Sequence, residues 1–342
     1  MQYEAPSLSQ WKQLYEAIAE FETIKCWEWM YDDDVFGVKD PQTGETAYCC
    51  ILGNAGEEFG IVAYIGQEGL KNLLDILYGN INPDDKNIFF EQKSLACYLT
   101  DRERLEPREL KTIRETGVKF RGKNHWPLVR SYEPGMAPWY LDAQQCCFFT
   151  HIIYQAIDVS MRCKEDKAIL ESDSPLTFLV RVPKTDANQN LIWEDRRITV
   201  KKPASISVSF QLDDEEALHR LKMIKKRPDL VLEADVFFLP KAIGEKDERP
   251  YFPMMAVLMD HKRGMVLSYN MFTNLRHDGY KGLEILIDFI FDHNALPSKI
   301  LTQNFNSYCL FKDICQQLGI ELKESNRLKN VENFKREMAN YV

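Results

Sequence analysis

The feature that most constrains this sequence is the order of apolar runs in its last third. Three strand-like runs follow one another, and helical and strand-like runs then alternate. The strand-like runs span 231–239, 253–259, 265–272, 299–302 and 320–323, and the helical ones span 282–293, 308–318 and 330–341. Strands joined by short turns pair antiparallel, whereas a strand that returns after a crossover helix pairs in parallel. The order predicts an α/β domain with a mixed five-stranded sheet and helices on both faces.

The first half of the chain predicts a separate α+β domain. Large apolar residues recur at helical spacing from Trp11 to Phe21, after Ser7, a residue type that caps helix N-termini. Strand-like runs separated by turn residues then predict a small antiparallel sheet against this helix. The predicted strands span 35–38, 46–52, 59–65 and 94–99, and further helices span 68–78, 107–116 and 142–163.

A polar stretch separates these two regions. From residue 166 onward, Pro175, Pro183 and Pro203 interrupt two short strand patterns. A chain of 342 residues is also long enough for about two domains. We therefore expect an N-terminal domain over 1–165, a connecting region with short strands and a helix over 166–226, and a C-terminal domain over 227–342.

Composition and the length of the apolar runs restrict the class of protein. Hydrophobic residues make up 45% of the chain, but every apolar run is far shorter than the ~20 residues that cross a bilayer. The first 21 residues carry three glutamates and lack the pattern of a secretory signal. The nine cysteines include two adjacent pairs and form no Cys-x-x-Cys motif, which favours free thiols over disulfides or zinc ligands. We expect a soluble, reduced, cytoplasmic protein without membrane contact.

Two acidic residues in the last third match positions of a known family. Asp235 lies in the first strand-like run, within Leu-Glu-Ala-Asp-Val, and Glu332 lies in the last helical run, within Val-Glu-Asn. Together with the element order, these residues resemble the RNase H-like core of retroviral-type integrases and transposases, over roughly 230–342. The resemblance implies that both carboxylates, with a third after the fourth strand, hold two divalent metal ions for phosphodiester cleavage.

The third acidic position of that family is neutral here. The family has Asp-Asn-Gly after its fourth strand, where this chain reads Thr-Gln-Asn and places Gln303. An amide offers one oxygen and no charge, so affinity for a second hard cation such as Mg²⁺ or Mn²⁺ should fall sharply. Asp260 is either a substitute ligand or a turn residue before Lys-Arg-Gly. The candidate catalytic residues are thus Asp235, Glu332 and Asp260, with the first two as candidate metal ligands, against structural or solvent-exposed roles for each.

Basic and aromatic residues interleave in a second candidate site, at 120–140. Its members are Arg121, Lys123, Trp126, Arg130, Tyr132 and Trp139. Such a strip can stack bases and clamp phosphates of a nucleic acid. In the alternative interpretation, the aromatic rings anchor a core and the arginines pair with carboxylates.

The whole chain also resembles a family of uncharacterised bacterial proteins known only as domains of unknown function, and that resemblance implies no activity. Three functions therefore stay open. The first is a noncatalytic binding or scaffold protein that contacts nucleic acid or a protein partner, as the neutral Gln303 suggests. The second is a metal-dependent nuclease that uses Asp235 and Glu332. The third is a protein-interaction module, suggested by the net charge of -9, since phosphate binding needs clustered cations. The sequence leaves the oligomeric state open.

Overall fold

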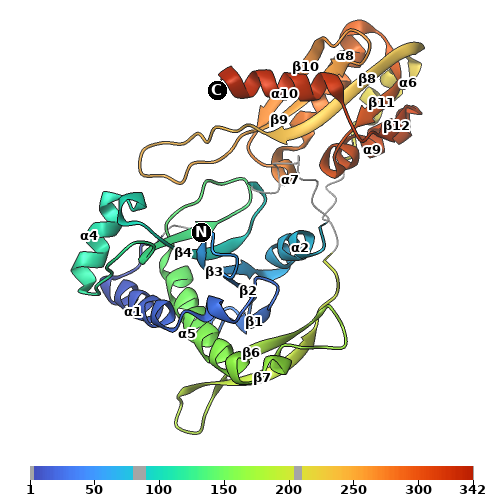
Figure 1. Cartoon of the computed structure of the whole chain (residues 1–342). Coiled ribbons are helices and arrows are strands. Elements are labelled where there is room, and N and C mark those ends of the chain that lie inside the picture. The colour runs from blue at the N-terminus through green and yellow to red at the C-terminus, as the bar shows by residue number, and fades with distance from the viewer. Residues whose placement is uncertain (1–3, 80–89, 204–209, 342) are drawn as a thin grey trace. The chain divides into compact units, whose positions relative to one another are not determined.

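The computed structural model describes residues 4–79, 90–203 and 210–341. They form two compact units, each built around its own sheet (Figure 1). The N-terminal unit holds described residues 4–134 and 138–203, and the C-terminal unit holds 135–137 and 210–341. The region 166–226, expected to connect two domains, is instead divided between the units, because its two strands complete the N-terminal sheet.

A seven-stranded mixed sheet forms the centre of the N-terminal unit, in the order β5-β4-β3-β2-β1-β6-β7. Its strands are β1 (Phe36–Lys39), β2 (Thr46–Leu52), β3 (Phe59–Ile65), β4 (Ser94–Thr100), β5 (Trp126–Tyr132), β6 (Thr177–Thr185) and β7 (Leu191–Thr199). Among the described residues of this sheet, β1 and β6 pair in parallel and the other neighbouring strands pair antiparallel. The sheet is larger than the sequence predicts, because β5 carries Pro127 and polar residues typical of loops, which an edge strand tolerates.

Helices cover both faces of this sheet. On one face, α1 (Leu8–Ile24), α4 (Pro107–Thr116) and α5 (Ala143–Glu165) enclose the larger core, and on the other face α2 (Gly66–Leu77) packs on β2 and β3. Short 3-10 helices are η1 (Cys26–Glu28), η2 (Arg102–Arg104) and η3 (Lys167–Ile169). The predicted N-cap Ser7 is confirmed, with a capping box to Gln10.

The C-terminal unit contains the predicted five-stranded mixed sheet, in the order β10-β9-β8-β11-β12. Its strands are β8 (Lys226–Phe238), β9 (Met254–Asp260), β10 (Val266–Phe272), β11 (Leu296–Thr302) and β12 (Glu321–Glu324). The first three pair antiparallel, and β11 pairs in parallel with both β8 and β12. This is the pairing that the order of elements in the sequence predicts.

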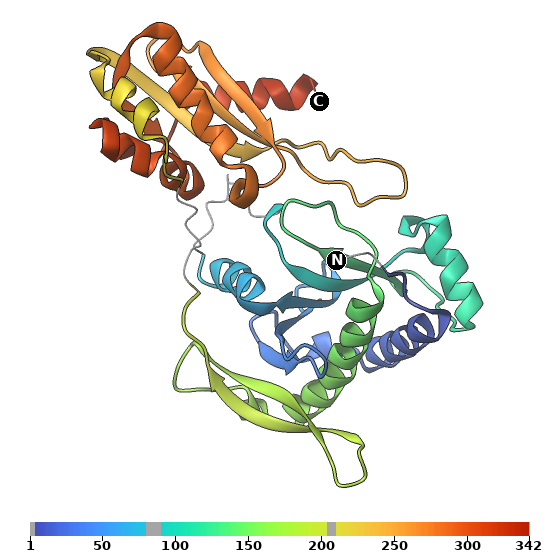
Figure 2. The same cartoon turned by 180° about the vertical axis from the view of Figure 1, so that it is seen from behind.

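Two apolar cores lie on opposite faces of the C-terminal sheet. Strand β8 alternates between them, since Leu232, Ala234 and Val236 face one core and Phe237 faces the other. The helices of the first core are α6 (Glu215–Met223), α7 (Leu275–Asp278), α8 (Tyr280–His293) and α9 (Phe305–Leu318). Helix α10 (Lys329–Tyr341) covers the second core, and Figures 1 and 2 show α8 and α10 on opposite sides of the sheet.

All nine cysteines are free thiols. Across residues 4–79, 90–203 and 210–341, no helix is long and apolar enough to cross a membrane.

Candidate functional site

Asp235 is fully buried on β8, on the face of the sheet that α10 covers. Its Oδ1 accepts hydrogen bonds from the Asn304 amide and from the Ser307 hydroxyl, the latter at 2.7 Å. Asn304 is the N-cap of α9, so Asp235 ties β8 to the start of that helix. Buried polar groups are normally hydrogen-bonded, and Oδ1 of Asp235 follows this rule.

Lys335, on α10, forms an ion pair with Oδ2 of Asp235. Within the described part of the chain this oxygen accepts no hydrogen bond, so its charge is balanced by the ammonium group alone. The Lys335 ammonium also lies 4.6 Å from the centre of the Phe237 ring, in a cation–π contact. A side chain of the protein therefore supplies the positive charge that a metal ion would bring to Asp235.

Glu332 and Gln303 are in direct contact, as the resemblance implies for the last two positions of the acidic set. The Gln303 amide donates to Oε1 of Glu332 at 3.2 Å, and Arg327 Nε donates to Oε2 at 2.9 Å. The hydrogen bond from Arg327 lowers the pKa of Glu332, with a smaller contribution from Gln303 and partial desolvation acting in the opposite direction. Glu332 also lies one helical turn before Lys335, so one face of α10 brings both residues to this cluster.

Asp260 is not brought to the other two acidic residues. It pairs with Leu232 in the β8–β9 register, whereas Asp235 pairs with Val257. Residues directly opposite each other in a sheet share a face, so Asp260 lies on the Leu232 face and Asp235 on the other. The Oδ1 atom of Asp260 accepts hydrogen bonds from the backbone N–H groups of Lys262 and Arg263, at 2.9 and 2.7 Å. These are the contacts expected of an aspartate that begins a turn.

Glu233, which the sequence interpretation leaves out, is a second buried carboxylate on the α10 face. Its side chain is 1% exposed and accepts from three donors: His261 Nδ1 at 2.7 Å, Asn330 Nδ2 at 3.0 Å and the Val331 backbone N–H at 3.3 Å. Asn330 and Val331 lie in the first turn of α10, so Glu233 binds the N-terminus of that helix. The signal in the sequence is a glutamate on the inward-facing side of an otherwise apolar strand.

Asp235, Glu332 and Gln303 do not fit the two-metal centre that the resemblance implies. The oxygens of Asp235 and Glu332 are bound by amide, hydroxyl, ammonium and guanidinium groups, and the position between them is a neutral amide. Among the residues that the structure describes, no three histidine, cysteine or acidic side chains are placed to hold a metal ion. Hard divalent cations need several anionic or carbonyl oxygens directed at one point.

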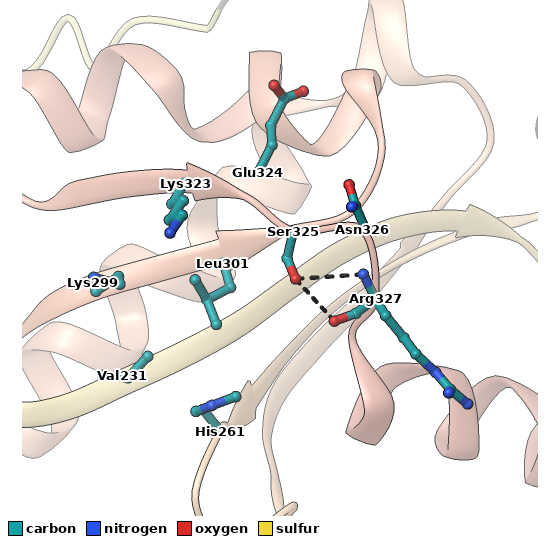
Figure 3. A pocket seen from close by; sticks show the side chains of 9 residues that line it. All are labelled: Val231, His261, Lys299, Leu301, Lys323, Glu324, Ser325, Asn326 and Arg327. Atoms are coloured by element: carbon teal, nitrogen blue, oxygen red, sulfur yellow. Dashed lines mark hydrogen bonds between the residues drawn. The ribbon is translucent and has the colours of Figure 1, made fainter. Parts of the chain in front are cut away.

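An open pocket of about 690 Å³ lies on the same face of the C-terminal sheet, beside the N-terminus of α10 (Figure 3). Lys299 and Lys323 lie on the adjacent strands β11 and β12, and His261 lies next to β8. Glu324 extends away from the lysines in Figure 3, and Arg327 extends toward the other end of the pocket. Lys299 contacts Glu321 at 2.9 Å, whereas Lys323 forms no ion pair with any described residue. We call this pocket the basic groove.

The basic and aromatic residues predicted at 120–140 all lie in the N-terminal unit, and they do not form one continuous clamp. Arg130 is bound to Glu109 and Glu106, and the hydrogen bond and charge of Glu109 raise its pKa against the effect of desolvation. Trp126 packs on Phe120. The other members have different surroundings: Arg121 and Lys123 are exposed before β5, Tyr132 ends β5, and Trp139 contacts Tyr140.

Comparisons with known proteins identify families of unknown function. Residues 11–181, half of the chain, match a domain of unknown function, DUF7309. The chain belongs to the DUF7309 family. In this DUF7309 protein, residues 217–339 match a second domain of unknown function, DUF6930, which falls on the C-terminal unit. The search of curated proteins gives no match.

One solved structure shows a limited similarity to this DUF7309 protein. It is a chain in the cryo-EM structure of the simian T-cell lymphotropic virus intasome in complex with PP2A regulatory subunit B56 gamma. The similarity covers 33% of this chain and 40% of that chain, with 17% sequence identity and a TM-score of 0.24. The DUF7309 protein thus spans less than half the length of that chain.

Proposed function

We propose that the C-terminal unit is a noncatalytic, RNase H-like binding module that contacts the phosphate backbone of a nucleic acid. The observation that carries the noncatalytic part is the Lys335 ammonium on Asp235. An ammonium group bound to a buried carboxylate occupies the place of a cation without activating water, and Gln303 removes the charge needed for a second one. The element order and the contact between Gln303 and Glu332 support the RNase H-like description.

The basic groove supports the choice of nucleic acid as partner. Lys299 and Lys323 are close neighbours on one face of the sheet, and Ser325 and Asn326 add hydrogen-bonding groups beside them. Phosphate contacts of this kind are independent of base sequence and give salt-dependent binding. Because the net charge of the chain is -9, only local clusters of lysine such as this one can attract the phosphates of a nucleic acid.

We expect the wild-type protein to bind no divalent metal at this cluster and to cleave no nucleic acid. Mn²⁺ should leave the thermal unfolding midpoint unchanged, because no acidic set is free to bind it. The double variant Gln303→Asp/Lys335→Ala supplies the missing carboxylate and removes the competing ammonium, so Mn²⁺ should stabilise this variant. Cleavage by the wild type in Mg²⁺ or Mn²⁺, abolished by Asp235→Asn, would refute the noncatalytic assignment.

A fluorescent single-stranded oligonucleotide should bind through the basic groove with an affinity that falls as salt rises. Fluorescence anisotropy should show that Lys299→Ala/Lys323→Ala reduces the slope of log affinity against log salt by about one to two, since a free lysine contributes about one unit and Lys299 is also bound to Glu321. Lys312→Ala, an exposed lysine on α9, is the matched control and should keep the wild-type slope. If the double variant and the control gave equal salt-dependence slopes, the basic groove would not be the binding site of the oligonucleotide.

A further inference from the structure

A second pocket lies entirely within the N-terminal unit and takes no part in the function proposed above. It has a volume of about 540 Å³ and is lined by the end of α1, η1, the β2–β3 turn and the loop before β5. This volume is within the range of small-molecule sites, about 300–1,000 Å³. The residues that decide its chemistry are Glu22, Lys25, Trp27, Phe59, Lys123 and His125.

The inner wall of the pocket is aromatic and closely packed. The ring centroids of Trp27 and Phe59 are 5.3 Å apart, and Trp27 is 8% exposed. Gly53 has a φ of +127°, and a Cβ there would lie 2.6 Å from the Phe59 ring, so the backbone at this turn is in direct contact with the aromatic pair. Asn54 Nδ2 donates to the Trp27 carbonyl at 3.1 Å and holds the turn in place. The wall is therefore rigid and apolar.

The rim of the pocket carries two lysines with no ion-pair partner among the described residues. Lys25 ends α1 in the left-handed region, with φ 56°. Glycine is the usual residue there, because a side chain costs roughly 1–2 kcal/mol in that conformation. Lys123 lies across the pocket in the loop before β5. The two lysines therefore place positive charge on two sides of the pocket.

A polar pair on the same rim is already fixed in orientation. His125 Nδ1 lies 2.5 Å from Oε1 of Glu22, on α1. This contact uses one ring nitrogen of His125, and Nε2 has no hydrogen-bond partner within the described ranges. The pair can therefore offer a further donor or acceptor to a molecule in the pocket. Glu22 and Glu28 are the two carboxylates of the lining, and Lys25 and Lys123 are its two lysines. The rim therefore carries charges of both signs and is not acidic.

We propose that this pocket binds a small molecule that joins an aromatic ring to an anionic group, the chemistry of a nucleoside monophosphate. The ring would contact Trp27 and Phe59, and the anionic group would bind Lys25 and Lys123. The volume of the pocket and its single aromatic wall fit a mononucleotide better than a polymer, which needs a continuous groove with repeated stacking positions.

The test is calorimetric titration of the full chain with AMP, GMP, CMP and UMP, and with inorganic phosphate. We expect at least one mononucleotide to bind more tightly than phosphate, with Lys25→Gly and Lys123→Ala each weakening it by about tenfold. Lys25→Gly suits the left-handed backbone, so folding should be retained, and Lys119→Ala is the matched control because Lys119 is exposed and lies outside the pocket.

Three results would overturn the proposal. The first is the absence of mononucleotide binding at millimolar concentration. The second is equal affinity for mononucleotide and phosphate, which would remove the aromatic wall from recognition. The third is equal affinity of the Lys25, Lys123 and Lys119 variants, which would place the ligand elsewhere. Because the pocket variants lie outside the basic groove, none of these results bears on oligonucleotide binding by the C-terminal unit.

Discussion

Replacing Asp235 with alanine is expected to lower the free energy of unfolding of the C-terminal unit by about 3–5 kcal/mol, the usual cost of removing one member of a buried ion pair. Asp235 is fully buried, and its loss removes the carboxylate with which the Lys335 ammonium forms an ion pair beside an apolar core. The Asn304 amide and the Ser307 hydroxyl also lose their acceptor. The effect therefore combines a lost ion pair with unsatisfied donors.

Hydrogen exchange measured by mass spectrometry can assign this loss to the C-terminal unit. All six tryptophans lie in the N-terminal unit, so tryptophan fluorescence reports on that unit. We expect faster exchange in peptides of β8, α9 and α10 in the Asp235→Ala variant. A double-mutant cycle with Lys335→Met should give strong coupling, because the two side chains form one ion pair and each single change removes it. If Asp235→Ala lowered the free energy of unfolding by less than about 1 kcal/mol, the ion pair and hydrogen bonds of this carboxylate would not stabilise the unit as described.

The contrast between the two units shows what the sequence can predict. The strands β8 and β9 and the helices α8 and α9 of the C-terminal unit follow from hydrophobic period, because their apolar residues fill the cores on the two faces of the sheet. Strand β5 cannot be predicted from hydrophobic period. Its sequence, with Trp126 and Arg130, is also typical of a loop that binds nucleic acid. Its arginine is instead neutralised by Glu109, which is distant in sequence and joined only by the fold.

The candidate site shows the same limit at the level of single residues. The positions of Asp235, Gln303 and Glu332 can be predicted from strand order, since the ends of parallel strands and the last helix meet at one edge. The charge that balances Asp235 cannot be predicted in that way. Lys335 lies three residues after Glu332 on an exposed-looking stretch of helix, and only the packing of α10 on β8 directs it inward. The contact that decides the chemistry is therefore a tertiary one.

Replacing Glu233 with alanine is expected to loosen α10 and to lower the free energy of unfolding by about 2–4 kcal/mol, since a buried acceptor for several donors is lost. Glu233 is the contact by which β8 holds the first turn of α10, through Asn330 and the Val331 N–H. A carboxylate at a helix N-terminus also interacts favourably with the helix dipole. Without it, the apolar side of α10 should separate from the second core more often.

Amide exchange in α10 is the measurement that checks this expectation. The Glu233→Ala variant should exchange faster across α10 than the wild type, whereas Glu233→Gln should show a smaller change, because an amide oxygen still accepts from the Val331 N–H. The matched control is His261→Ala, which removes a partner whose side chain is 50% exposed and should change exchange little. Unchanged protection of α10 in Glu233→Ala would mean that apolar packing of Val331 and Phe334 alone holds the helix. In that case the buried carboxylate would have no structural role in attaching α10, and its burial beside Asp235 would need another explanation.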